Sequence, residues 1–133
     1  MSLGYDIYAD IGLLYIRGQG ELTQRQHMDT MLAWLRDPQY ESCNDALVDF
    51  TDVQTTPTVG ELRELIAMLK QERPARGPRR LAVVTSKPIA FVIARVFEQL
   101  VRLRELPLEV KVFMNLGRAW AWLRPDLPPF QLH

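Results

Sequence analysis

The chain has 133 residues, and 16 Lys plus Arg residues balance 16 Asp plus Glu residues, so its formal net charge is zero. This length predicts one domain, and the balanced charge gives no argument for a nucleic-acid partner or an anionic membrane. Cys43 is the single cysteine, which excludes an intrachain disulfide, and no apolar run approaches the ~20 residues of a membrane span. We expect one cytoplasmic domain over residues 1–133, with residues 1–3 treated as a cloning remnant.

The first elements are predicted to be a β-hairpin and a helix. Residues 5–10 and 13–17 are rich in Tyr, Ile and Leu, and Asp10 or Gly12 is suited to the turn between them. Thr23 with Gln26 three residues later forms a capping-box signature, and Pro38 ends the helix that follows. The face of this helix predicted to be buried holds Met28, Met31, Leu32 and Leu35, with His27 and Trp34 on its flank.

The middle of the chain is predicted to supply the central strands. Residues 45–50 form a short apolar run that is typical of a strand buried on both faces. Thr58 and Glu61 form a second capping box, which begins a helix with an apolar stripe on one side. Residues 81–84 are again entirely apolar and predict another buried strand.

The third predicted helix has an unusually wide apolar surface. Ser86 is the expected N-cap, and Pro88 falls in the first turn, where its missing N–H costs nothing. Apolar residues between 89 and 103 span roughly 200° of the helical wheel, twice what packing on one sheet requires. Phe91 projects on the polar side of this helix. We therefore expect part of the helix to contact a protein partner or to form the wall of a hydrophobic pocket.

The last elements are a strand at residues 108–113 and a helix capped by Asn115. The inner face of that helix is predicted to hold Leu116, Ala119, Trp120 and Leu123, and residues 124–133 form a Pro-rich tail. A hairpin followed by alternating strands and helices predicts an α/β fold with a mixed sheet of about five strands and four helices.

Polar residues gather where two predicted parallel strands end. Thr55, Thr56 and Thr58 follow one strand, and Ser86 and Lys87 follow the next. Both loops lead into helix N-termini, which favour an anion such as phosphate. The plainer alternative is that these hydroxyl groups cap helices and turns.

Candidate catalytic residues are scarce. His27 and His133 are the only histidines and are far apart in the sequence, so we expect no catalytic triad, no metal site and no cofactor. His27 is expected to be a partly buried packing residue. Asp49 and Asp52 resemble the acidic residues of a response-regulator receiver domain, but a receiver has a further acidic pair after its first strand, where this chain has only Asp10.

Two segments resemble a known family. LVDFTDVQTTPTVGEL at residues 47–62 resembles the strand, turn and helix start of STAS-like proteins, and VFMNLGRAWAWL at residues 112–123 resembles their closing strand and helix. The order of elements is similar as well. STAS-like proteins have the SpoIIAA-like fold and include bacterial anti-sigma-factor antagonists and the C-terminal domains of sulphate transporters. The resemblance implies that fold for the whole chain.

The resemblance also implies a regulatory site. In the antagonists, a partner kinase phosphorylates a serine at this helix start, which switches partner binding off. That position corresponds to Thr58 here, and the glycine that follows in the family corresponds to Gly60. The family's Asp-Ser-Ser-Gly run reads Pro57, Thr58, Val59 and Gly60, so proline replaces the acidic neighbour. The sequence is closer to divergent STAS-like and lipid-binding-like relatives, and phosphorylation of Thr58 stays open.

The leading hypothesis is a non-enzymatic bacterial interaction module that binds a protein partner through residues 55–62 and the third helix, as a homodimer. A second hypothesis is a carrier or sensor of a small hydrophobic molecule. Its pocket would be lined by Phe91, Ile93, Phe97 and Trp120, with an anion site at Ser86 and Lys87. A receiver-like phosphoprotein is the third hypothesis.

Overall fold

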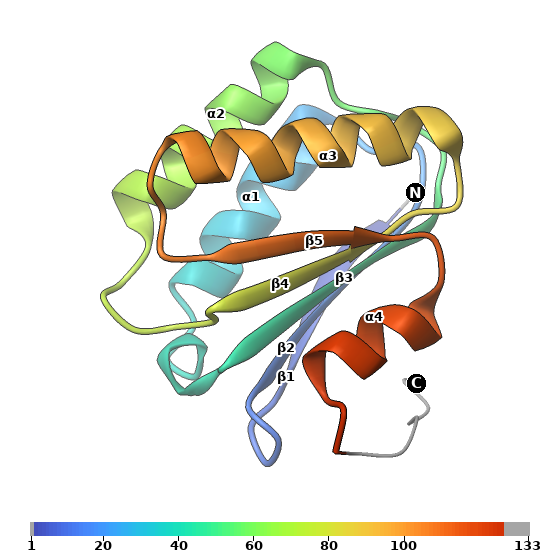
Figure 1. Ribbon diagram of the computed structural model, residues 1–133. Coiled ribbons are helices and arrows are strands. Elements are labelled where there is room, and N and C mark those ends of the chain that lie inside the picture. Colours follow the sequence, from blue (N-terminus) through green and yellow to red (C-terminus); the bar gives the residue numbers. More distant parts are fainter. Residues whose placement is uncertain (1, 127–133) are drawn as a thin grey trace.

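The computed structural model describes residues 2–126, which form a single layer of strands with helices on both faces (Figure 1). The strands are β1 (Ser2–Tyr8), β2 (Leu13–Gly20), β3 (Asp45–Val53), β4 (Arg80–Val84) and β5 (Glu109–Phe113). The helices are α1 (Gln24–Leu35), α2 (Val59–Glu72), α3 (Pro88–Leu103) and α4 (Leu116–Leu123), and a 3₁₀ turn covers Tyr40–Ser42.

The strands lie in the sheet in chain order, from β1 to β5. β1 and β2 pair antiparallel as a hairpin, and β2 to β5 pair parallel. Each parallel step needs a crossover, which α1, α2 and α3 supply in turn. The predicted mixed α/β sheet of five strands and four helices is confirmed within the described residues.

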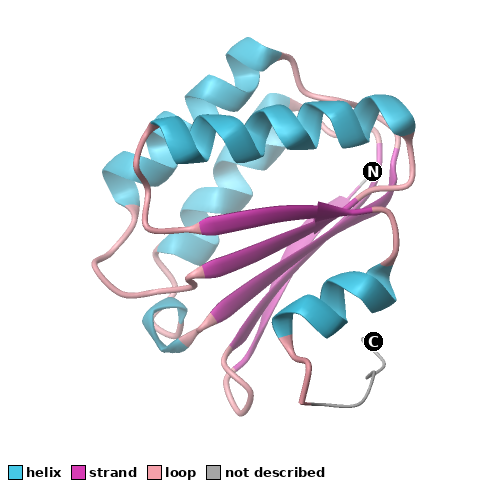
Figure 2. Ribbon diagram, in the orientation of Figure 1, coloured by secondary structure: helices cyan, strands magenta, loops and turns pink. Residues whose placement is uncertain are grey.

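Side chains alternate along the strands between the two faces of the sheet, so the interior is divided into two hydrophobic cores. In β2, Leu14 and Ile16 face one core while Leu13 and Tyr15 face the other. This is the two-residue period of a strand whose two faces are both covered. Helices α1, α2 and α3 cover one face, and α4 covers the opposite face (Figure 2).

Side-chain caps fix where three of the helices begin. Thr23 and Thr58 each form a complete capping box, with Gln26 and Glu61 respectively, as the sequence predicts. Asn115 accepts a hydrogen bond from the Arg118 N–H at 3.0 Å and so caps α4. These caps satisfy N–H groups that have no partner within the helix.

The predicted N-cap of α3 is wrong by one residue. Lys87, not Ser86, is the N-cap, and its side chain makes no capping hydrogen bond. Pro88 drives the residue before it out of the helical region, and Lys87 is accordingly extended, with φ −107° and ψ 137°. The helix therefore begins at the proline.

Several boundaries differ from the sequence pattern. β1 begins at Ser2, which pairs with Gln19, so residues 2 and 3 belong to the sheet. β3 continues to Val53 because β2 pairs with it as far as Gly20. Leu116, predicted on the inner face of the last helix, is exposed. Most of the predicted Pro-rich tail, residues 127–133, lies outside the described residues.

The end of α4 is fixed to the sheet by a charged contact. Arg124 Nε lies 3.1 Å from a carboxylate oxygen of Asp45, and the same guanidinium donates a hydrogen bond to the Ile11 carbonyl. Burial raises the Asp45 pKa, and Arg124 opposes that rise. No helix within residues 2–126 is both long and apolar enough to cross a membrane.

Candidate functional site

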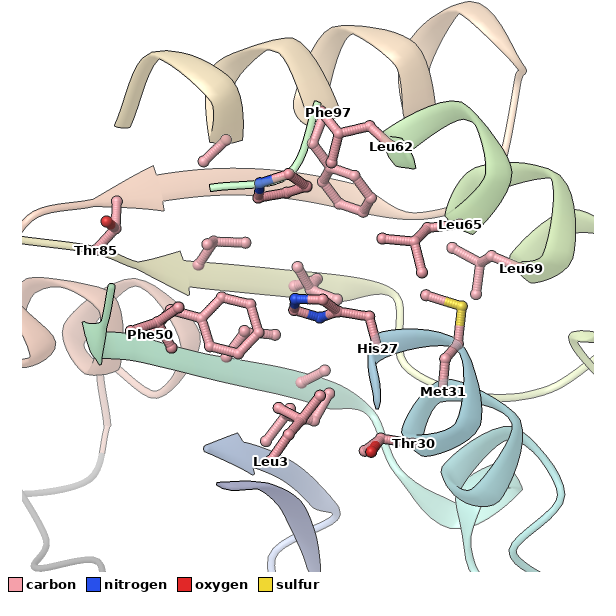
Figure 3. Close-up of a pocket in the computed structure, with 18 of the residues that line it drawn as sticks. Leu3, His27, Thr30, Met31, Phe50, Leu62, Leu65, Leu69, Thr85 and Phe97 are labelled. Carbon is pink, nitrogen blue, oxygen red and sulfur yellow. The ribbon is translucent and has the colours of Figure 1, made fainter. Parts of the chain in front are cut away.

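A cavity of about 150 Å³ lies between the sheet and the three helices on its larger covered face (Figure 3). Apolar residues make up most of its wall. The sheet contributes Leu14, Ile16, Ala46, Val48, Phe50, Leu81 and Val83. The helices contribute Met31 and Trp34 from α1, Leu62, Leu65 and Leu69 from α2, and Ala90, Ile93, Ala94 and Phe97 from α3. The protein thus holds a hollow inside its principal core.

Small side chains leave this space unfilled. Ala46 on β3 faces the helices, and Ala90 and Ala94 line the cavity from α3. Residues four apart lie on the same side of a helix, so the two α3 alanines form one shallow stretch above the sheet. Phe97 and Phe50 close the space beside them. The cavity therefore follows from the choice of residues along α3 and β3.

One ionisable imidazole lies in this apolar wall. His27 projects from α1 toward the middle of the cavity (Figure 3), and its ring meets Phe50 edge-on at a centroid distance of 5.7 Å. Burial lowers the His27 pKa below its ordinary value of 6.5, with a smaller opposing effect from the Glu61 carboxylate. The ring is therefore favoured in its neutral form.

The loop between β3 and α2 forms part of the cavity wall near the carboxyl ends of the strands. Thr55, Thr56 and Pro57 line the cavity there and are partly exposed. The Thr55 hydroxyl accepts a hydrogen bond from the Leu22 N–H at 2.9 Å and donates one to the Leu22 carbonyl at 3.2 Å. Thr55 thus fastens this loop to the segment before α1, while Thr56 faces the cavity.

Thr58 and Gly60, the predicted phospho-acceptor and its glycine, are exposed at the start of α2. The Thr58 hydroxyl accepts from the Glu61 N–H at 3.1 Å, and the Glu61 carboxylate accepts from the Thr58 N–H at 2.9 Å. A Cβ on Gly60 would lie 3.8 Å from its nearest neighbour, so the backbone does not require glycine here. Neither residue lines the cavity.

Ser86 and Lys87, the predicted anion-binding pair, lie at the start of α3. The Ser86 hydroxyl donates to the Thr51 carbonyl at 2.8 Å, which joins the loop after β4 to the last part of β3. Lys87 is exposed and caps α3 with its backbone alone. The structure thus gives Ser86 a structural hydrogen bond and brings neither residue into the cavity.

The four residues expected to form one hydrophobic pocket are divided between two faces of the sheet. Ile93 and Phe97 line the cavity. Trp120 packs on the opposite face with Leu13 and Leu47, because α4 covers that face. Phe91 is partly buried on α3 and is not among the lining residues.

The acidic residues do not form the cluster of a receiver domain. Asp49 accepts hydrogen bonds from the Thr51 hydroxyl at 2.6 Å and from the Tyr15 hydroxyl at 3.4 Å. Burial, assisted by Asp49, raises the Tyr15 pKa to about 12. Asp10 lies in the hairpin turn before the start of β2, whereas Asp49 is the middle residue of β3 and pairs with Arg17, so the two carboxylates are separated along the strands. Within residues 2–126, no group of three His, Cys, Asp or Glu residues could hold a metal ion.

Sequence reasoning missed most of the cavity. It assigned His27 to packing and gave no role to Met31, Trp34 or Phe50 beyond the core. A signal was nevertheless present, because Ala90 and Ala94 recur on the inward side of a helix that otherwise carries large apolar residues. Small residues four positions apart on the buried side of a helix can indicate a cavity as well as close packing of the helix.

Comparisons with known proteins agree with this architecture. The chain is similar in structure to an uncharacterized protein of the DUF3478 family from Shewanella loihica PV-4, whose crystal structure has a SpoIIAA-like fold. The TM-score is 0.52 and the sequence identity 21%, and the alignment covers 92% of each chain. No curated protein matches the sequence significantly. The SpoIIAA-like family profile matches residues 13–124. The chain therefore belongs to the SpoIIAA-like family, which confirms the STAS-like resemblance of its sequence.

Proposed function

We propose that this protein binds a small, mainly apolar molecule in the cavity beneath α1, α2 and α3, and acts as a carrier or sensor. The observation that supports the proposal is an apolar space of about 150 Å³ inside the core. An engineered cavity of this volume in another protein stays dry and binds benzene, so the space suits a molecule with about one aromatic ring.

A bound molecule would make this space more stable than it is when empty. Unfilled apolar volume costs about 24 cal/mol per Å³, which for this cavity gives an upper bound of about 4 kcal/mol. A ligand that fills the space regains part of this through contacts with the leucine, phenylalanine and methionine side chains of the wall. The partly exposed residues of the β3–α2 loop and of α3 offer a short path from solvent.

Isothermal titration with ethylbenzene tests the proposal. We expect the wild-type protein to bind with a dissociation constant below about 1 mM, which corresponds to about −4 kcal/mol. Ala94→Leu places a larger side chain in the cavity and is expected to weaken binding at least tenfold. The matched control is Ala67→Leu, the same substitution at an exposed position of α2, and it should leave binding unchanged. The absence of binding heat in the wild type, or equal affinities of Ala94→Leu and Ala67→Leu for ethylbenzene, would reject the proposal.

A second candidate function, self-association through α3, is supported by a different surface. Ile89, Val92 and Leu103 are 71%, 60% and 75% exposed, and they lie within an arc of roughly 60° on the helix. Large apolar side chains gathered in this way are typical of protein contacts. Membership of the SpoIIAA-like family is compatible with a regulatory role of the anti-sigma-factor antagonist type. Light scattering over a range of concentrations tests this candidate, because a second copy covering the stripe would raise the measured mass.

A further inference from the structure

The cavity wall contains one imidazole, that of His27, which has no hydrogen-bond partner among the described residues. Neither ring nitrogen of His27 makes a hydrogen bond within residues 2–126, and the partly exposed side chain lies in the cavity wall. Its neighbour Thr30, one helical turn further along α1, also lines the cavity and has no side-chain partner among these residues. A neutral imidazole offers one donor and one acceptor, so it can bind a hydroxyl or a carbonyl group.

No lining residue in the described part of the chain is a lysine, arginine, aspartate or glutamate. On α2, the Glu61 carboxylate is the charged group that acts on the His27 pKa. On the sheet, His27 contacts the uncharged ring of Phe50. An ionised ligand would lose its hydration without gaining an opposite charge, which is costly in an apolar site. A carboxylate would in addition meet the negative field of Glu61.

We propose that the ligand of this cavity is an uncharged molecule with an apolar body and one hydrogen-bonding group, and that His27 binds that group. The inference rests on the proposed ligand-binding function and adds the chemical class of the ligand. Hydroxyl and carbonyl compounds belong to this class, whereas carboxylic acids do not. Thr30 lies on the same side of α1 and would help to surround the polar group.

Three probes of similar size separate the possibilities, namely ethylbenzene, 4-ethylphenol and benzoate. At about pH 7.5 the phenol is neutral and the benzoate is ionised. In wild-type protein we expect the phenol to bind at least as tightly as ethylbenzene, and the benzoate at least 100-fold more weakly. His27→Phe keeps a ring beside Phe50 but removes both hydrogen-bonding nitrogens. It should lower the affinity ratio of phenol to ethylbenzene at least fivefold, because a buried hydroxyl is then unpaired.

Two further measurements decide the outcome. The side-chain ¹⁵N resonances of His27 should shift with 4-ethylphenol but change little with ethylbenzene. Arg25→Ala, at an exposed position of the same helix, is the control and should leave the ratio unchanged. Tight benzoate binding, or an unchanged ratio of phenol to ethylbenzene affinity in His27→Phe, would overturn this inference. Ethylbenzene binding in the same experiment would still support the proposed function. Failure of all three probes would reject both.

Discussion

Single residues of the β3–α2 loop have separate structural roles although their side chains are alike. Thr55 fastens the loop to Leu22 through two hydrogen bonds, Thr56 lines the cavity, and Thr58 caps α2. The sequence grouped them as one functional edge because they occupy one short segment. Their roles differ because the side chains of successive loop residues point in different directions. The amino-acid composition of the loop does not encode these directions.

Thr58→Ala is predicted to lower the free energy of unfolding by about 1 kcal/mol, because the Glu61 N–H loses its acceptor. Chemical denaturation measures this loss. Thr58→Ser keeps the hydroxyl and is the control, expected to stay within a few tenths of a kcal/mol of the wild type. Equal stability of Thr58→Ala and the wild type would contradict the capping role.

His27 gives the protein a pH-dependent stability. Burial lowers its pKa in the folded state below the ordinary value of 6.5, so the unfolded chain takes up a proton first as the pH falls. The free energy of unfolding is therefore expected to decrease as the pH drops below about 6.5. Denaturation of wild type and His27→Phe between about pH 5 and pH 7.5 isolates this contribution. Parallel curves for the two proteins would show that His27 does not titrate in this way.

At the scale of elements, α3 has apolar residues on two sides. Ile93, Ala94 and Phe97 face the cavity, while Ile89, Val92 and Leu103 face outward. The wide apolar arc read from the sequence thus corresponds to an inner face over the core and an outer exposed stripe. The helical wheel predicted the width of the apolar arc of α3. It could not predict which part of the arc is buried, because burial depends on where α2 and β5 lie.

Val92→Lys is predicted to prevent self-association, since it places a charge within the exposed stripe of α3. Light scattering should find the wild-type mass rising with concentration and the Val92→Lys mass constant, with association weakened at least tenfold. Ala67→Lys adds the same charge at an exposed position of α2 and should associate like the wild type. A wild-type mass that stays monomeric at all concentrations would contradict self-association through α3.

Local sequence signals predicted most elements well. The capping boxes at Thr23 and Thr58 fixed two helix starts because each is formed by residues three apart in the chain. The start of α3 was misplaced since the conformational effect of Pro88 on Lys87 outweighs the capping preference of Ser86. The extension of β3 to Val53 depends on pairing with β2, a contact distant in sequence.

For the molecule as a whole, the cavity links stability to binding. Ala94→Leu should fill part of the space and raise the unfolding free energy of the ligand-free protein by up to about 2 kcal/mol. The same change should weaken ligand binding, so stability and binding move in opposite directions. Denaturation and titration of one preparation measure both effects. A loss of stability in Ala94→Leu would mean that the added side chain does not fit the space.

The site itself was only partly predictable. Ile93 and Phe97, two of the four residues predicted for an apolar pocket, line the cavity, because the helical period places them on the inward side of α3. Trp120 was assigned to the same pocket because it is large and apolar, but α4 covers the other face of the sheet. Which face of the sheet a helix covers is a property of the whole fold. The cavity is formed by residues of β1 to β4, α1 to α3, the 3₁₀ turn and the connecting loops, so it could not be assembled from local patterns.

Intermolecular NOEs between bound ethylbenzene and assigned methyl groups of the protein would locate the ligand. A ligand inside the core should give NOEs to Met31, Leu65 and Ile93, which line the cavity from three helices. The same spectra should contain none to Ile89 or Val92 on the outer side of α3. NOEs confined to the outer stripe, or none at saturating ligand, would contradict the account of the cavity as a binding site.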